Sequence, residues 1–100
     1  MKTVIVGHIR LPVENLDAAR AAIAPLVAGT LAEEGCISYA FAQDVADPGV
    51  LRIAEIWATR AALDAHMQAP HFADWRVAAG GLGITERQVK IFTISNEESL

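Results

Sequence analysis

The chain has 100 residues, of which 53% are hydrophobic and 20% charged, and its formal net charge is −4. This length and apolar content indicate a single domain over residues 1–100, with a polar tail at residues 95–100. The eight Lys and Arg are scattered along the chain, which argues against nucleic acid or an anionic membrane as a partner. No apolar run approaches the roughly 18 residues that a membrane-spanning helix needs.

The first strand and the first helix follow from residues 1–35. Residues 3–11 are rich in Val and Ile, which predicts a strand. A helix is expected from Asn15, a residue suited to an N-cap, because apolar residues recur with a 3.6-residue period; this element ends at Gly35. Pro25 costs about 3 kcal/mol inside a regular helix, so we expect a kink or an irregular turn near Ala24.

In residues 36–94 the spacing of apolar residues alternates between a two-residue period, typical of strands, and a helical period. A turn sequence, ADPG, joins two alternating segments and predicts an antiparallel hairpin. Thr59 can cap the next helix, and Pro70 ends it and opens another. The expected elements are strands at 36–45, 50–58 and 85–94, and helices at 60–68 and 71–80.

This element order matches the βαββαβ plan of the ferredoxin-like fold, an α+β architecture with helices on one face of an antiparallel sheet. The other face is left uncovered, although the hairpin strands carry mostly apolar or small residues on it. A domain of this size buries only roughly 60 to 65% of its unfolded surface. We therefore expect a homodimer in which the sheets of two subunits cover each other.

The single cysteine, Cys36, excludes an intrachain disulfide, and the N-terminal sequence shows no cleavage pattern of a signal peptide. We therefore expect a cytoplasmic protein.

Two polar residues in the expected strands are candidates for a site. Glu55 shares its strand face with Ile53 and Trp57, where an unpaired carboxylate is costly. It either reaches solvent, pairs with Arg52 or Arg87, or lines a pocket. His8 lies in the first strand and is either a satisfied sheet histidine or a second residue of the same cavity.

The segment LDAHMQAPHFADW, residues 63–75, contains two of the three histidines. On a continuous helix His66 and His71 would lie about 140° apart, whereas helical metal ligands are three or four residues apart. Pro70 makes the true separation unpredictable. With no third evident ligand, we expect no metal. His66 is either a core residue or a proton acceptor, and His71 and Trp75, which share a helix face, are wall or packing residues.

Residues 33–72 contain a set of motifs in a fixed order: Glu-x-Gly-Cys, a strand Tyr, an acidic Pro turn, Glu-x-Trp, Ala-Leu-x-x-His and Pro-x-Phe. This set resembles the central signature of the antibiotic biosynthesis monooxygenase domain family. The matching positions are Glu33 or Glu34, Gly35, Cys36, Tyr39, Pro48, Glu55, Trp57, Leu63, His66, Pro70 and Phe72.

The resemblance implies a dimeric α+β barrel and a cofactor-independent monooxygenase that oxidises a small electron-rich aromatic, a hydroquinone or an anthrone, with O₂. It requires no metal or organic cofactor, because the substrate anion itself reduces O₂. The implied catalytic residues are His66, as proton acceptor, and Glu55. The implied substrate-binding residues are Tyr39, Trp57, Phe72, Trp75, His71 and His8.

Two alternatives stay open. One is a non-catalytic dimer that only binds a small molecule. The other is a haem-binding or haem-degrading protein of the same fold, although that branch of the family has an Asn late in the first strand, where this chain has Gly7 and His8. The family also includes sugar-phosphate isomerases and members without known activity, so membership alone does not fix the chemistry.

Overall fold

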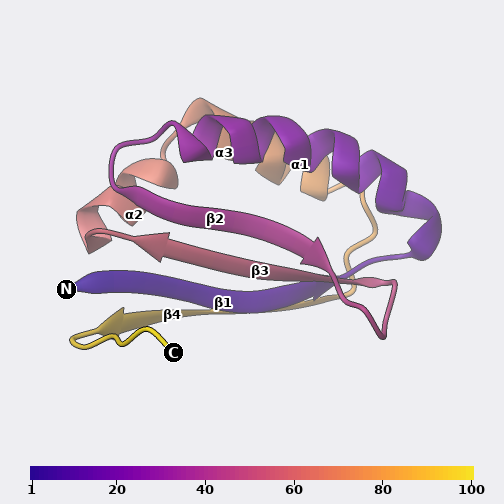
Figure 1. Ribbon diagram of the computed structural model, residues 1–100. Helices are drawn as coiled ribbons and strands as arrows, with labels where there is room; N and C mark the ends of the chain where they lie inside the picture. Colours follow the sequence, from indigo (N-terminus) through magenta and orange to yellow (C-terminus); the bar gives the residue numbers. More distant parts are fainter.

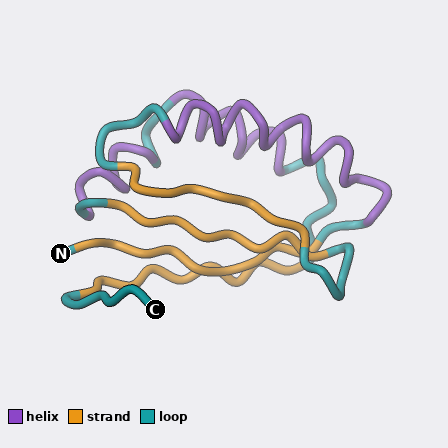
Figure 2. Tube along the Cα trace, viewed as in Figure 1, coloured by secondary structure: helices purple, strands orange, loops and turns teal.

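The computed structural model describes residues 1–100 and has one four-stranded antiparallel sheet in the order β2-β3-β1-β4. All helices lie on one face of this sheet, and β4 is the edge strand farthest from them (Figures 1 and 2). In chain order the elements are β1 (Lys2–Arg10), a 3-10 helix (Val13–Asn15), α1 (Leu16–Leu31), β2 (Cys36–Gln43), β3 (Val50–Trp57), α2 (Arg60–His66), α3 (Pro70–Ala79) and β4 (Glu86–Ile94). This order confirms the expected ferredoxin-like fold.

The expected irregular turn near Ala24 is wrong, because α1 runs unbroken from Leu16 to Leu31 with Pro25 inside it. Pro25 lies on the exposed side of the helix, as does Ala21, whose carbonyl loses its partner when residue 25 has no N–H. Water can bond to that carbonyl, so the proline leaves no unsatisfied group in the core. The helix also ends four residues before Gly35.

Asn15 occupies the N-cap position of α1 as predicted, but its side chain makes no capping bond. It donates instead to the carbonyl oxygen of Leu82 at 2.9 Å. This bond ties the start of α1 to the loop before β4. Thr59 does cap α2 as predicted, accepting from the backbone N–H of Ala62 at 3.1 Å.

The strand register decides which side chains face the helices. Thr3 pairs with Trp57 and Ile5 pairs with Glu55 across β1 and β3, and Tyr39 of β2 pairs with Glu55 on its other side. These five side chains are buried. They form two neighbouring rows across the sheet beneath α1 and α2, and these rows are the floor of the site described below.

The opposite face of the sheet has no helix over it (Figure 1). Strand alternation places the even-numbered residues of β1 on this face. Val6 of β1 is 52% exposed and Phe92 of β4 is 48% exposed. Cross-strand pairing sets Phe92 beside Val4, which in turn pairs with Ile56 of β3. The outer face therefore has an apolar half, which is bordered at the β4 edge by Lys90, the partner of Val6.

None of the helices combines the length and hydrophobicity needed to cross a bilayer.

Candidate functional site

His66 is the last residue of α2 and is 1% exposed. Three turn residues separate it from Pro70, which occupies the first turn of α3 as predicted. Because Pro70 starts a new helix, the angle estimated for a continuous helix does not apply. The structure brings the rings of His66 and His71 to a centroid distance of 5.9 Å.

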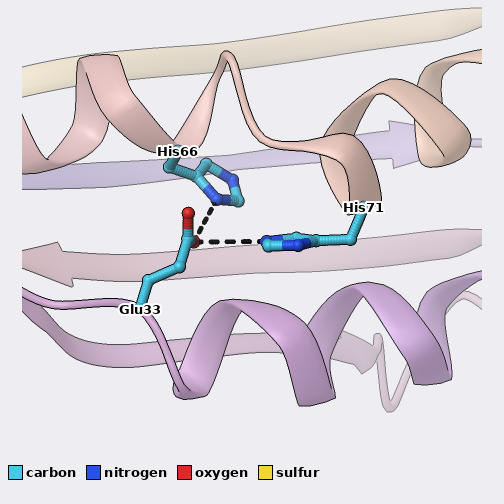
Figure 3. A group of neighbouring side chains, drawn as sticks. All are labelled: Glu33, His66 and His71. Atoms are coloured by element: carbon cyan, nitrogen blue, oxygen red, sulfur yellow. Dashed lines mark hydrogen bonds and ion pairs between the residues drawn. The ribbon is translucent and has the colours of Figure 1, made fainter.

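Glu33 reaches the two histidines from the turn between α1 and β2 (Figure 3). Gly35 shapes this turn with a φ of 84°, and a Cβ there would lie 2.6 Å from the Cβ of Ala62, so the turn packs closely on α2. Oε2 of Glu33 accepts a hydrogen bond from Nδ1 of His66 at 2.6 Å and lies 3.4 Å from Nε2 of His71.

The two ring nitrogens of His66 have different environments. Burial lowers the pKa of His66 below its usual value of 6.5, and this effect outweighs the opposing effect of Glu33. The ring is therefore neutral at pH 7, with its proton on Nδ1, where the carboxylate accepts it. Nε2 is then a bare acceptor, and it is buried without a hydrogen-bond partner.

Aromatic rings surround His66 on several sides. Its ring centroid lies 4.9 Å from that of Trp57, 4.9 Å from that of Phe72 and 5.2 Å from that of Tyr39. Burial raises the pKa of Tyr39 strongly, and the Glu55 and Glu33 carboxylates add to the shift. Its phenol therefore stays protonated. The site is an enclosure of aromatic rings around the imidazole of His66.

Glu55 lies on the floor of this enclosure and is 7% exposed. Its Oε1 accepts a hydrogen bond from Nε1 of Trp57 at 2.9 Å. Arg52 pairs instead with Asp44 on the outer face, so the expected alternative of an Arg52 partner does not hold. Burial raises the pKa of Glu55, and the Glu33 carboxylate adds to the rise. Glu55 makes no hydrogen bond with His66; it holds the Trp57 indole, which contacts the His66 ring.

Glu55→Gln is expected to make the free energy of unfolding depend less on pH. Below pH 4.5 the Glu55 carboxyl is protonated in both the folded and the unfolded protein. Above pH 4.5 the carboxyl ionises first in the unfolded chain, because burial raises its pKa in the folded protein. The free energy of unfolding therefore declines as the pH rises. Each unit of elevation costs about 1.4 kcal/mol. Urea unfolding of both proteins between pH 4 and pH 8 checks this, with Glu98→Gln in the exposed tail as the control. Parallel curves for Glu55→Gln and the wild type would contradict it.

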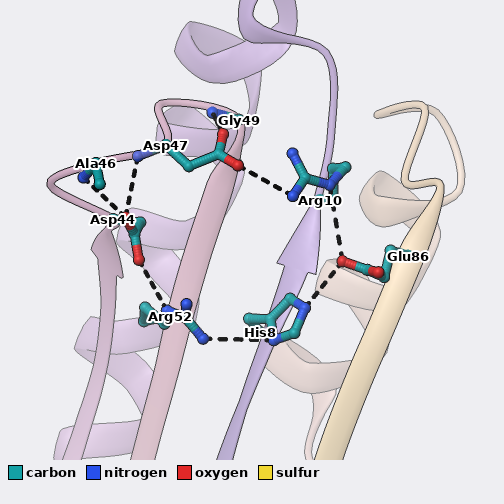
Figure 4. Close-up of polar contacts among 8 residues, drawn as sticks. All are labelled: His8, Arg10, Asp44, Ala46, Asp47, Gly49, Arg52 and Glu86. Carbon is teal, nitrogen blue, oxygen red and sulfur yellow. Dashed lines mark hydrogen bonds and ion pairs between the residues drawn. The ribbon is translucent and has the colours of Figure 1, made fainter.

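His8 lies on the outer face of the sheet, away from His66. It belongs to a polar network that crosses three strands (Figure 4). Arg52 donates to Nδ1 of His8 at 3.5 Å, and Nε2 of His8 donates to Glu86 at 2.9 Å. Arg10 contacts Glu86 at 3.7 Å and Asp47 at 3.0 Å. The structure therefore supports the interpretation of His8 as a satisfied sheet histidine, and His8 does not join the other predicted site residues.

Trp75 lies beyond the His66 enclosure and packs edge-on against Phe41, with ring centroids 5.5 Å apart. Phe41 also contacts Tyr39, at 5.9 Å. A cavity of about 120 Å³ also borders Phe41, and its lining residues are Leu16, Arg20, Ile23, Phe41, Gln43 and Leu51. None of the predicted site residues lines this cavity, but Phe41 connects it to the aromatic enclosure.

Glu33 is the residue of the candidate site that the sequence does not single out. It occurs in the Glu-x-Gly-Cys motif, in which the sequence alone does not distinguish Glu33 from Glu34 as the matching glutamate. The structure separates the two, because Glu33 is half-buried against the histidines and Glu34 is exposed. The useful signal was the glycine at position 35, which forces a turn and directs one of the two carboxylates inward.

Sequence comparison identifies related proteins. The model of the antibiotic biosynthesis monooxygenase family matches residues 3–78. An uncharacterised protein of Synechocystis sp. is 29% identical over 97 residues, covering 97% of this chain and 66% of that protein. A protein of Mycobacterium tuberculosis with a provisional monooxygenase name is 38% identical over 66 residues, covering 66% of this chain and 64% of the relative. The sequence matches thus extend over about two thirds of each curated relative.

Solved structures with the same fold include relatives of this kind. The structure of the M. tuberculosis protein has a TM-score of 0.88 at 27% identity, covering 99% of this chain and all of the other. A structure from Deinococcus radiodurans, provisionally described as an antibiotic biosynthesis monooxygenase, has a TM-score of 0.90 at 20% identity, with coverage of 98% and 97%.

The fold and the candidate site define a class of protein: a small ferredoxin-like α+β domain with a buried histidine enclosed between its sheet and helices. Since the family model covers most of the chain, this protein belongs to the antibiotic biosynthesis monooxygenase family.

Proposed function

We propose that this protein is a cofactor-independent monooxygenase that oxidises a small electron-rich aromatic, of the hydroquinone or anthrone type, with O₂. The observation that carries the proposal is the state of His66, whose Nδ1 is held by Glu33 while its Nε2 is an unpartnered acceptor among aromatic rings. Membership of a family named for monooxygenases supports the same reaction class.

The proposed reaction begins when a substrate hydroxyl, or the acidic C–H of an anthrone, gives its proton to Nε2 of His66. Glu33 stabilises the imidazolium that forms, because its carboxylate already accepts the Nδ1 proton. The resulting phenolate or enolate is the reductant for O₂. For an anthrone, the CH₂ group loses two hydrogens and gains one oxygen atom, and the second oxygen atom leaves as water.

The flat substrate would bind against the Tyr39, Trp57 and Phe72 rings, which exclude water from the anion. His66 is 1% exposed, so a ring must move to admit the substrate. We place the entrance at Phe41, because this half-buried side chain borders both the cavity beside α1 and the Tyr39 ring.

Haem does not fit the same residues. Three aromatic rings lie within 5.2 Å of the His66 imidazole centroid. A macrocycle bound at His66 would have to displace this whole enclosure.

O₂ consumption by the chelator-treated, flavin-free protein tests the proposal. With a panel of hydroquinones and anthrones we expect saturable O₂ uptake above autoxidation and a matching rise in quinone absorption. His8→Ala, which removes a histidine on the outer face, is expected to behave as the wild type. Substrate binding without O₂ uptake across the panel would instead favour a protein that binds a small molecule without catalysis.

We further propose that two copies form a homodimer through their outer sheet faces. Val6 and Phe92, about half exposed in the single subunit, lie in the apolar half of this face, and a two-fold arrangement would bury them against the same half of a partner. Sedimentation velocity of the wild type at micromolar concentration checks this assembly, and a monomer would refute it.

A further inference from the structure

We propose that Glu33, His66 and His71 form a binding site for a divalent first-row transition-metal ion of the Zn²⁺ type (Figure 3). The ligand atoms are Oε2 of Glu33, Nδ1 of His66 and Nε2 of His71, and the donor atoms of the three residues lie within 4.8 Å of one another. Two imidazoles and a carboxylate suit Zn²⁺, Co²⁺ or Fe²⁺, whereas Mg²⁺ and Ca²⁺ favour oxygen ligands. The site goes beyond the proposed oxidation, which uses no metal.

All three pairs of ligand atoms lie within 4.8 Å, and one pair already has the spacing of a tetrahedral site. Ligands at roughly 2.0 to 2.1 Å from a tetrahedral ion are roughly 3.3 Å from one another. Oε2 of Glu33 and Nε2 of His71 are 3.4 Å apart. Oε2 and Nδ1 of His66 are 2.6 Å apart because a proton joins them, and this pair must separate by less than about 1 Å when an ion replaces the proton.

The three side chains come from the ends of elements. Glu33 lies in a turn, His66 at the end of α2 and His71 in the first turn of α3. A shift of this size therefore requires no change within a helix or strand.

An unsatisfied ligand nitrogen at the same place provides an independent observation. Nε2 of His71 is buried and makes no hydrogen bond, although it points at Glu33 (Figure 3). The unpartnered nitrogen of His66 is Nε2, which is not one of the proposed ligand atoms, so His71 alone carries this observation. Buried nitrogens without partners are costly, and a bound ion would give the His71 nitrogen its missing partner. Three protein ligands would leave a fourth position on the ion open.

The charge balance of the enclosure also favours a cation. The Glu33 and Glu55 carboxylates are near enough to each other that Glu33 raises the pKa of Glu55. Neither carboxylate forms an ion pair with a Lys or Arg. In contrast, the His8–Glu86 pair on the outer face is accompanied by Arg10 and Arg52, which repel a cation. The inner histidines are therefore the site, and His8 supplies a matched control.

Metal titration of tag-free, chelator-treated protein tests the site. We expect one Co²⁺ per chain with visible absorption typical of a tetrahedral site, and one Zn²⁺ per chain by calorimetry. His71 is 25% exposed, so His71→Ala should fold, which circular dichroism checks. This variant is expected to bind at least about 100-fold more weakly, because even outer-shell changes cost roughly 10- to 100-fold. His8→Ala is expected to bind as the wild type.

Three results would overturn the metal site: no stoichiometric Co²⁺ or Zn²⁺ binding by the wild type, equal affinity in folded His71→Ala, or loss of binding in His8→Ala. The titration needs no substrate, so it is separate from the test of the oxygenase. Protein that binds Zn²⁺ but consumes no O₂ with any substrate would refute the proposed function and leave the metal site standing.

Discussion

His66→Asn is expected to lower the rate of O₂ uptake by about 10²- to 10⁴-fold, the usual contribution of a positioned proton acceptor. The Asn side chain can still donate to Glu33 as Nδ1 of His66 does, but it has no counterpart of the basic Nε2. The substitution therefore removes proton transfer while keeping the hydrogen bond that positions residue 66. Initial rates measured with an oxygen electrode check this expectation.

The pH profile distinguishes loss of a base from loss of packing. In the wild type the rate should fall as pH is lowered through the pKa of His66, which burial places below 6.5, since only the neutral ring accepts a proton. The residual rate of His66→Asn should lack this step. His8→Asn makes the same change on the outer face and should leave rate and profile intact. A full rate in folded His66→Asn would remove His66 from the mechanism.

Val6→Asp is expected to weaken the proposed dimer at least about 100-fold. Val6 is 52% exposed in one subunit, so the carboxylate should be tolerated by the folded monomer. A two-fold interface contains the substitution twice, and burying each unpaired charge costs about 1.4 kcal/mol or more. Sedimentation velocity over a concentration series gives the dissociation constants.

Val77→Asp is the matched control, because Val77 is 81% exposed on α3, on the other side of the sheet. It should dimerise like the wild type. If Val6→Asp dimerises as tightly as Val77→Asp, the interface does not include the centre of β1, and the assembly proposed for the outer sheet faces is wrong.

The fold was predictable because its signals are local. Period-2 and 3.6-residue patterns, with turns at Pro48–Gly49 and Pro70, define the order of the elements and hence the topology. The behaviour of Pro25 was not predictable, since the cost of a proline depends on whether the freed carbonyl faces solvent. Only the packing of α1 on the sheet determines that orientation.

The site was predictable only in part. Strand alternation correctly placed Glu55 with Trp57, and the same alternation excludes Arg52 as its partner, because residues three apart lie on opposite faces. The Glu33, His66 and His71 cluster has no such local signal. It depends on the turn between α2 and α3 and on a turn more than thirty residues earlier, and sequence periodicity specifies neither.

The meeting of Glu33 with His66 and His71 closes a long stretch of chain that contains the β2–β3 hairpin and α2. Whatever occupies the space between these side chains, a shared proton or an ion, acts as a removable cross-link between segments distant in sequence. An occupant that binds only the folded chain also stabilises it, by about 4 kcal/mol at 1,000 times its dissociation constant. The occupancy of the site and the resistance of the whole domain to unfolding are therefore one coupled equilibrium.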